Sequence, residues 1–284
     1  MTVGSPPHPA LVPDAVAVVT GGASGIGLAA AHRFLELGLK VCIADRDLAA
    51  LDAAEEELNV PDRVLARPVD VSSFEAMTAL SEEIVETWGK APSVLMNNAA
   101  TGQGGDVFED LSKWTSLIDV NLMGVLHGIQ AFVPAMLESD APGLVINTGS
   151  KQGITQPPGN TAYNVSKSAV KALSEGLAHT LRAKTGDRVT AHLLIPGFTY
   201  TGMVKAHFGP EKPEGAWLPE QVAGYMLDKL QAGDFYILCP DDETTTDMDY
   251  RRIVWTAGDI IENRPALSRW HPDYAEAFER FMDV

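Results

Sequence analysis

A glycine-rich turn joins an apolar segment to a helical one near the start of the chain. Ala15–Thr20 is a short run rich in β-branched residues, which is typical of a strand buried on both faces. The glycines of residues 21–27 follow, and then a helical pattern from Leu28 to Leu37. Glycine lets the backbone approach a pyrophosphate, and the free N–H groups of a helix start point toward the anion. The sequence therefore predicts a nucleotide-binding cradle formed by Gly21, Ser24, Gly25, Ile26 and Gly27.

The second apolar run ends in a carboxylate. Leu39–Asp45 is a predicted strand, and Asp45 lies eighteen residues past the last glycine of the turn. A carboxylate there accepts hydrogen bonds from both adenosine ribose hydroxyls and repels a 2′-phosphate. Asp47 is better placed to cap the helix predicted at Leu48–Leu58. We therefore expect NAD as the cofactor, although Arg46 leaves NADP open because an arginine after this strand can pair with a phosphate.

Strands and helices alternate along most of the chain. Further strands are predicted at Arg63–Val69, Ser93–Asn97, Leu144–Asn147, Val189–Ile195 and Phe235–Cys239. Further helices are predicted at Ser73–Trp88, Leu111–Leu137, Thr161–Ala183 and Pro219–Leu230. This order predicts an α/β fold, a doubly wound parallel sheet of about seven strands with helices on both faces, Rossmann-like in type.

The stretch from Ser150 to Lys167 carries the predicted chemistry. Tyr163 and Lys167 are four residues apart, so on a helix they share one face. A phenol has a pKa of roughly 10, and a fixed ammonium beside it favours the phenolate and lowers that value. Ser150 precedes the turn at Pro158-Gly159, so its hydroxyl can reach the same point. The pattern predicts a proton-transfer site for an alcohol or a carbonyl, although the same spacing is also common in plain surface pairs.

From Ala15 to about Cys239 the chain resembles the short-chain dehydrogenases/reductases. The matching motifs are Thr20-Gly21-x-x-x-Gly25-x-Gly27, Asp70-Val71, Asn97-Asn98-Ala99, Asn121, Ser150, Tyr163-x-x-x-Lys167 and Pro196-Gly197. Seven motifs in the right order are highly specific. The chain departs from the pattern at Ala100, where the family commonly has glycine, and at residues 240–243, where Pro-Asp-Asp-Glu replaces a glycine-rich end.

The resemblance implies both the catalytic and the cofactor-binding residues. The implied catalytic tetrad is Asn121, Ser150, Tyr163 and Lys167. Besides the cradle, Asp45 and Arg46, the expected cofactor-binding residues are Asp70, Val71, Asn97, Asn98, Ala99, Tyr163, Lys167, Pro196, Gly197, Thr199 and Thr201. In that family the helices of Asn121 and Tyr163 usually pack against a second subunit, so a homodimer or homotetramer is expected. Taken without the family, an asparagine inside a helix is equally compatible with a solvated side chain or a kink.

The expected reaction is hydride transfer between a secondary alcohol and NAD. Tyr163 would be the general acid and base, and Ser150 would bind the substrate oxygen. Substrate contacts are expected from Ser150, Gln152, Gln156 and Phe198, and the apolar surroundings favour a hydrophobic or aryl substrate over a sugar. The alternatives are an NADP-dependent carbonyl reductase that uses Arg46, and a non-catalytic nucleotide-binding sensor or scaffold.

We expect three parts along the chain. Residues 1–13 are a loose arm, residues 14–240 form the dinucleotide-binding catalytic domain, and residues 241–284 are a helical extension on the same domain or on a neighbouring subunit. The extension has predicted helices at Thr244–Glu262 and Asp273–Met282, with a break at Pro265–Pro272. Simple packing is one interpretation of it. The other is a lid in which Trp255 or Trp270 lines a substrate pocket.

Composition limits the partners and the compartment. A net charge of −17 argues against binding to nucleic acid or to an anionic membrane. Cys42 and Cys239 lie in apolar runs, and the seven histidines show no ligand spacing, so neither a disulfide nor a metal site is expected. The chain start lacks a signal-peptide pattern, and no eighteen uninterrupted apolar residues occur. These features predict a cytoplasmic protein without a membrane span.

Overall fold

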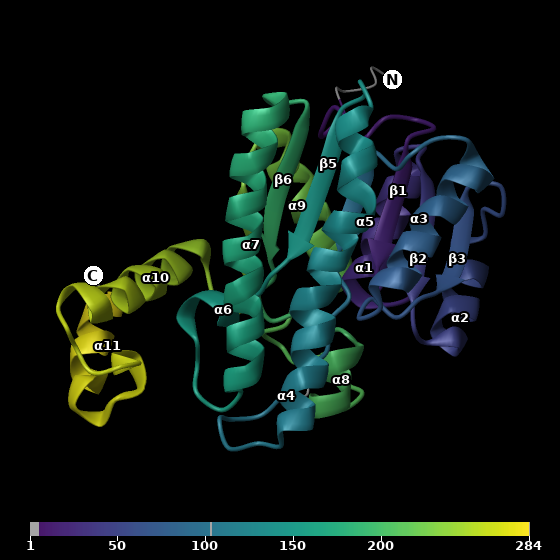
Figure 1. Cartoon of the computed structure of the whole chain (residues 1–284). Coiled ribbons are helices and arrows are strands. Elements are labelled where there is room, and N and C mark those ends of the chain that lie inside the picture. The colour runs from purple at the N-terminus through teal and green to yellow at the C-terminus, as the bar shows by residue number, and fades with distance from the viewer. Residues whose placement is uncertain (1–5, 103, 284) are drawn as a thin grey trace.

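A parallel sheet of seven strands forms the centre of the molecule in a computed structural model that describes residues 6–102 and 104–283 (Figure 1). The strands are β1 (Val16–Thr20), β2 (Lys40–Asp45), β3 (Val64–Pro68), β4 (Val94–Asn97), β5 (Gly143–Thr148), β6 (Val189–Ile195) and β7 (Tyr236–Leu238). Their spatial order is β3-β2-β1-β4-β5-β6-β7, and every neighbouring pair is parallel. The chain therefore reverses its winding direction between β1 and β4, where a doubly wound sheet binds its ligand. The predicted fold class is confirmed.

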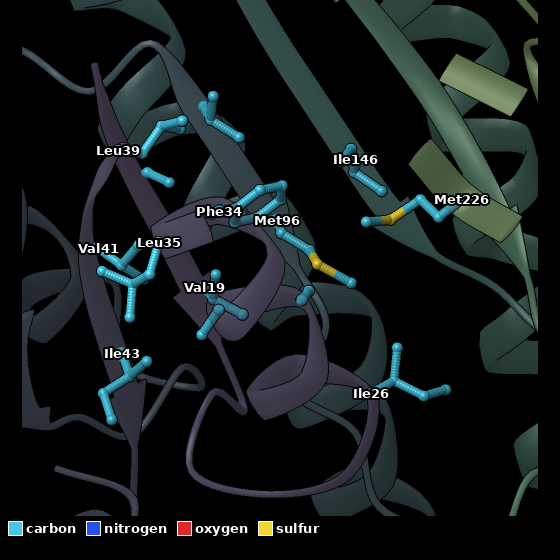
Figure 2. Packing of buried hydrophobic residues seen from close by; sticks show 14 of the residues in the cluster. Val19, Ile26, Phe34, Leu35, Leu39, Val41, Ile43, Met96, Ile146 and Met226 are labelled. Carbon is cyan, nitrogen blue, oxygen red and sulfur yellow. The ribbon is translucent and has the colours of Figure 1, made fainter. Parts of the chain in front are cut away.

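Helices cover both faces of this sheet. One face packs against α1 (Gly25–Glu36), α2 (Leu48–Leu58) and α9 (Pro219–Ala232), and the other against α3 (Phe74–Trp88), α5 (Gly124–Glu138) and α7 (Thr161–Thr185). In Figure 1, α5 and α7 lie in front of the sheet and α9 lies behind it. Because side chains alternate along a strand, Val19 packs in the first core and Val18 in the second. Figure 2 shows Val19 and Met96 of neighbouring strands beside Phe34 of α1, with Ile43 of β2 further away in the same core.

The helix predicted at Leu111–Leu137 is three consecutive pieces. These are α4 (Leu111–Ile118), a π-helical segment (Asp119–Met123) and α5. The stretch Leu111–Glu138 is long and apolar enough to match a membrane span by length and composition alone. Phe132, Val133 and Met136 of this stretch are buried in the core on the sheet, so its apolar character is that of a core helix.

Two short helices that the sequence pattern did not predict lie at the carboxyl end of the sheet. They are α6 (Gln152–Thr155), directly after Ser150, and α8 (Gly202–Phe208), in the segment after β6. In Figure 1, α8 lies beside α4 at the lower end of the molecule, and α6 lies beside α7. They are shorter than the window in which helical periodicity can be recognised.

The expected loose arm is wrong for the part of it that the structure describes. His8, Ala10 and Leu11 are buried against the core. The His8 ring hydrogen-bonds through Nε2 to the Thr190 hydroxyl of β6 at 3.0 Å, and its Nδ1 accepts from Ala10 N. Tertiary packing therefore fixes residues 6–13. Residues 1–5 lie outside the described residues.

The C-terminal extension projects from the side of the sheet domain (Figure 1). It consists of α10 (Thr246–Ile261), two 3-10 turns (Ser268–Trp270 and Pro272–Tyr274) and α11 (Ala275–Asp283). Trp255 packs against Phe278 and Phe281 with ring centroids 5.3 Å apart in both cases, and its Nε1 donates to Ser268 Oγ. This tryptophan therefore fills the extension's own small core, and its suggested place in a substrate-pocket wall is wrong.

Candidate active site

The glycine-rich turn has the shape of a phosphate cradle. Gly21 and Gly25 have φ values of +61° and +53°, in the left-handed region that favours glycine. A Cβ on Gly27 would lie 2.2 Å from Gly21 O, so the turn closes tightly only with glycine there. The first turn of α1 has no acidic residue, and Ser24 makes no side-chain cap, so the helix start keeps its N–H groups and positive potential for an anion. These features fit a dinucleotide pyrophosphate.

The carboxylate of Asp45 lies beside this cradle. Its Oδ2 accepts from Ala23 N at 3.4 Å, and its Oδ1 accepts from Asp47 N at 3.2 Å. Asp47 caps α2 through a bond from Ala50 N, as predicted. Arg46 and Asp70 line a nearby surface recess of about 560 Å³, which extends to α4. Hydrogen bonds from Ser72 lower the pKa of Asp70, so this recess contains both a cation and an ionised carboxylate.

The residues after β4 hold the turn in place. Asn98 Nδ2 donates to Thr20 O at 3.2 Å and to Gly21 O at 3.1 Å, and Thr20 Oγ1 accepts from Asn98 N and Ala99 N. A Cβ on Gly21 would lie 2.8 Å from Ala99 Cα, so this segment forms part of the cradle wall. Asn97 does not: its buried side chain donates to Asn147 Oδ1 at 2.9 Å within the sheet. Its place among the cofactor-binding residues stays a prediction.

Val71 also has a packing role in the structure. A Cβ added to Gly124 would lie 2.6 Å from Val71 Cγ2, so the Val71 side chain packs directly on that glycine. The Val71 carbonyl accepts from His127 Nδ1 at 2.9 Å. These contacts fix the loop after β3 against α5. Val71 itself is buried.

Tyr163 and Ser150 meet through their side chains. Asn160 caps α7 by accepting from Tyr163 N, which places Tyr163 in the first turn of the helix. Ser150 Oγ also accepts from Gln152 N at 3.2 Å, so the start of α6 orients it. Burial raises the pKa of Tyr163, and the hydrogen bond with Ser150 acts in the opposite direction. The phenol is therefore protonated at neutral pH in this structure.

Lys167 lies one turn further along α7. Its Nζ donates to Thr148 O at 2.8 Å and lies 5.8 Å from the centre of the Tyr163 ring. Burial lowers the pKa of Lys167 to about 8. The ammonium was expected to lower the pKa of Tyr163, but in this arrangement burial raises it. The carbonyl of Thr148 was a partner that sequence spacing could not indicate.

Asn121 lies in the π-helical segment and is fully buried. Its Oδ1 accepts from Thr101 N at 2.8 Å, and its Nδ2 donates to Thr101 O at 2.9 Å and to Ser166 Oγ at 3.1 Å. The side chain therefore ties α7 to the loop after β4. Without the family resemblance, the sequence allowed a solvated side chain or a kink at this position. Because Asn121 is fully buried, its side chain is not solvated. A π segment commonly marks a functional position in a helix.

The loop after β6 closes over the glycine-rich turn. A Cβ on Gly25 would lie 3.2 Å from the Thr201 methyl group, so these residues are in contact range. Thr199 is buried, and its hydroxyl donates to Gly197 O at 3.1 Å. The loop is also held by a bond from Trp217 N to Phe198 O. Pro196, Gly197 and Thr199 thus lie at the carboxyl end of β6, next to the cradle.

The expected substrate residues separate into two groups. Phe198 packs edge-on against Phe208 of α8 at 5.4 Å, and Met203 of α8 faces Gly102 after β4. Gln152 is exposed at the start of α6. Gln156 points elsewhere. Its Nε2 donates to Ser168 Oγ, and it lines a recess of about 280 Å³ that faces Leu267 of the extension and includes none of the tetrad.

The arrangement can move a proton at a buried phenol beside a dinucleotide cradle. Tyr163 and Lys167 come from α7, Ser150 from the loop after β5 and Asn121 from the π segment. Cys42 and Cys239 are buried and free, as predicted. Within residues 6–102 and 104–283, no cluster of three His, Cys, Asp or Glu side chains could hold a metal ion.

Comparison with known proteins agrees with this geometry. Residues 15–212 match the family model for short chain dehydrogenase. A 3β-hydroxysteroid dehydrogenase from Eggerthella lenta is 33% identical over 245 residues, which cover 80% of this chain and 92% of the relative. A short-chain dehydrogenase/reductase from Burkholderia phymatum in complex with NAD superposes with a TM-score of 0.79 at 32% identity, covering 89% of this chain and 96% of that one. An NADP active-site complex of RhlG from Pseudomonas aeruginosa superposes with a TM-score of 0.69 at 29% identity, covering 80% and 94%.

Proposed function

Because the chain belongs to the short-chain dehydrogenase family, and is thus an oxidoreductase, we propose that it transfers a hydride between a secondary alcohol and NAD. The observation that carries this proposal is the pairing of Tyr163 with Ser150 beside the glycine-rich cradle. A nucleotide sensor or scaffold has no need for a buried phenol that shares a hydrogen bond with a serine and has a lysine one turn away.

Tyr163 is the proposed acid and base. Because burial raises its pKa, the phenol is protonated at neutral pH and can donate its proton to a ketone oxygen in the reductive direction. In the oxidative direction it must first lose that proton, so alcohol oxidation should accelerate as the pH rises. Ser150 shares the hydrogen bond with Tyr163, which directs both hydroxyls to one substrate oxygen and stabilises charge that develops there.

Lys167 contributes a buried positive charge behind Tyr163. Since burial lowers its pKa to about 8, its charge is lost as the pH rises through that value. The bond to Thr148 O holds the ammonium at the end of β5, and there it would bind the nicotinamide ribose hydroxyls. A bound nicotinamide ring supplies the hydride acceptor, and Asn121 keeps the loop after β4 fixed on α7.

NAD is the proposed cofactor because of Asp45. Its carboxylate lies at the end of β2 beside the cradle, where ribose hydroxyls are bound in this fold. The NAD complex of the Burkholderia phymatum protein is consistent with this choice. NADP is the second candidate, since Arg46 lines the adjoining recess and RhlG forms an NADP complex.

The proposed substrate is a bulky hydrophobic secondary alcohol. Phe198, Phe208 and Met203 bring apolar surface to the carboxyl end of the sheet. The relative from Eggerthella lenta acts, by its name, on a 3β-hydroxysteroid, which is such an alcohol. An aryl alcohol has comparable apolar area and needs few polar contacts.

The test is the absorbance of reduced nicotinamide when purified protein is mixed with NAD and a panel of alcohols. The panel should contain small aliphatic, aryl, steroid and sugar alcohols, and Tyr163→Phe should be measured beside the parent. This variant keeps the ring and removes the proton carrier, so we expect a loss in kcat of about 10²-fold or more. A variant with nearly normal turnover would remove Tyr163 from the mechanism. If the parent protein binds NAD tightly but produces no reduced nicotinamide with any alcohol, the nucleotide-sensor function is favoured.

A further inference from the structure

Lys151 is a buried cation held between two carboxylates. Its Nζ lies 3.0 Å from Asp241 Oδ2 and 2.7 Å from Asp249 Oδ2. The three side chains are 17%, 5% and 6% exposed, respectively. We call this group the ion-pair node. Sequence reasoning noted Asp241 only as a departure from the family pattern and did not consider Lys151 or Asp249.

The node connects three segments that meet at the candidate site. Lys151 directly follows Ser150 and begins α6, because its carbonyl accepts from Ile154 N and Thr155 N. Asp241 follows β7 and accepts from Phe198 N at 3.1 Å, which holds the loop after β6. Asp249 belongs to α10 and is the node's connection to the C-terminal extension.

The node also touches the loop after β6, which contains several of the expected cofactor-binding residues. A Cβ on Gly197 would lie 2.6 Å from Asp241 Oδ2 and 2.9 Å from Lys151 Nζ. The ion pair therefore packs directly on the backbone of Gly197. A shift of the pair by a fraction of an ångström would move Gly197 and Phe198, because the contact leaves no free space.

Burial makes this geometry exacting. A buried ion pair adds little stability over an apolar replacement, but the loss of one partner leaves an uncompensated charge that forces the neighbours to rearrange. Asp241 retains backbone donors from Phe198 and Thr244 if Lys151 moves. Asp249 also interacts with Arg252 and Arg269, and Arg252 in turn donates to Thr244 Oγ1. The position of Lys151 therefore depends on where α10 places Asp249.

We propose that Lys151, Asp241 and Asp249 are positioning residues that fix the Ser150 turn relative to the Phe198 loop and make both depend on the C-terminal extension. This role rests on the proposed hydride transfer. The extension then contributes to the substrate step through an ion pair and does not need to cover the site.

The experiment compares Asp249→Asn with Asp247→Asn. Both substitutions remove one carboxylate from α10 with almost no change in size, but Asp247 is 72% exposed and pairs only with Arg251 of the same helix among its described contacts. We expect Asp249→Asn to lower kcat by about tenfold or more, since small misplacements at a catalytic site have large effects. The dissociation constant for NAD should stay within about threefold, because the cradle and Asp45 are unchanged. Asp247→Asn should match the parent.

Two further measurements separate positioning from general destabilisation. Asp249→Glu keeps the charge and should recover part of the lost kcat, with a melting temperature near that of the parent. Amide hydrogen exchange should be faster in Asp249→Asn at residues 152–155 and at Phe198, whose bonds the node holds. If kcat, NAD affinity and melting temperature fall together, or if the two asparagine variants behave alike, the node has no positioning role.

The exchange measurement also separates this inference from the proposed function. If the parent oxidises no alcohol in the panel, the hydride-transfer proposal fails. Amide hydrogen exchange then tests the positioning role of the node without any activity measurement. Faster exchange at residues 152–155 and 198 in Asp249→Asn, but not in Asp247→Asn, supports the node. Equal exchange in both variants overturns it.

Discussion

At the scale of a single side chain, Asp45 is the proposed determinant of the preference for NAD over NADP. Asp45→Ala removes the proposed acceptor for two ribose hydroxyls and the charge that repels a 2′-phosphate. Hydrogen bonds to a charged group contribute about 1.5–3 kcal/mol each, so the loss of two should lower NAD affinity by about 100-fold or more. NADP affinity should rise or stay constant. Titration of protein fluorescence with each cofactor measures both constants.

Asp47→Asn is the control for this substitution, because asparagine also caps a helix and Asp47 lies two residues away. It should leave the preference unchanged. If Asp45→Ala keeps the parent's preference between NAD and NADP, Arg46 would be the residue that determines it. In that case Arg46→Ala should weaken NADP binding.

The residue scale also shows where sequence reasoning stops. The spacing of Tyr163 and Lys167 predicted that they share a helix face, since the geometry of a helix is local. The pKa of Tyr163 is not local, because burial in the folded chain raises it. The direction of the Gln156 side chain also depends on structure that the sequence pattern does not reveal. Its backbone is left-handed, with φ at 50°, and this turn directs the side chain toward Ser168.

The N-terminal segment provides a test at the scale of an element. Burial, and secondarily the neighbouring His192, lower the pKa of His8 to about 4, so His8 is neutral when folded and gains a proton on unfolding in acid. The stability from neutral His8 is complete above pH 6.5 and is lost as the pH falls from 6.5 through 4. Between pH 7.5 and 4.5 the parent should lose about 2–3 kcal/mol of unfolding free energy more than His8→Gln. Urea unfolding at both pH values measures this difference, and parallel losses would show that His8 does not titrate during unfolding.

Sequence patterns predicted long elements well and short or irregular ones poorly. The strands and long helices were found because apolar periodicity extends over many residues. The π segment at Asp119–Met123 keeps nearly the same apolar pattern as an α-helix, so the pattern could not distinguish it. Residues 6–13 contain four prolines and no periodic pattern, and tertiary contacts with the core and with β6 order them.

At the scale of the whole molecule, α7 has a second face that turns away from the sheet. Val165, Ala172, Gly176 and Thr180 on it are exposed, while Lys167, Val170 and Ser174 of the same helix are buried. Small side chains let a second helix approach closely. The family resemblance implies a subunit contact through this helix, so we propose that this outward face of α7 joins two copies of the chain.

Gly176→Arg tests this proposed contact. A Cβ on Gly176 meets no atom within 4 Å in the single chain, and replacing a mid-helix glycine gains about 1 kcal/mol at most, so the chain itself should fold normally. Between two copies the same arginine would clash. Light scattering should therefore give the mass of two or four chains for the parent and of one or two chains for the variant, while Gly176→Ala keeps the parent mass. Ala79→Arg, on the exposed side of α3, controls for the added charge. If Gly176→Arg retains the full parent mass, the subunits associate through another surface.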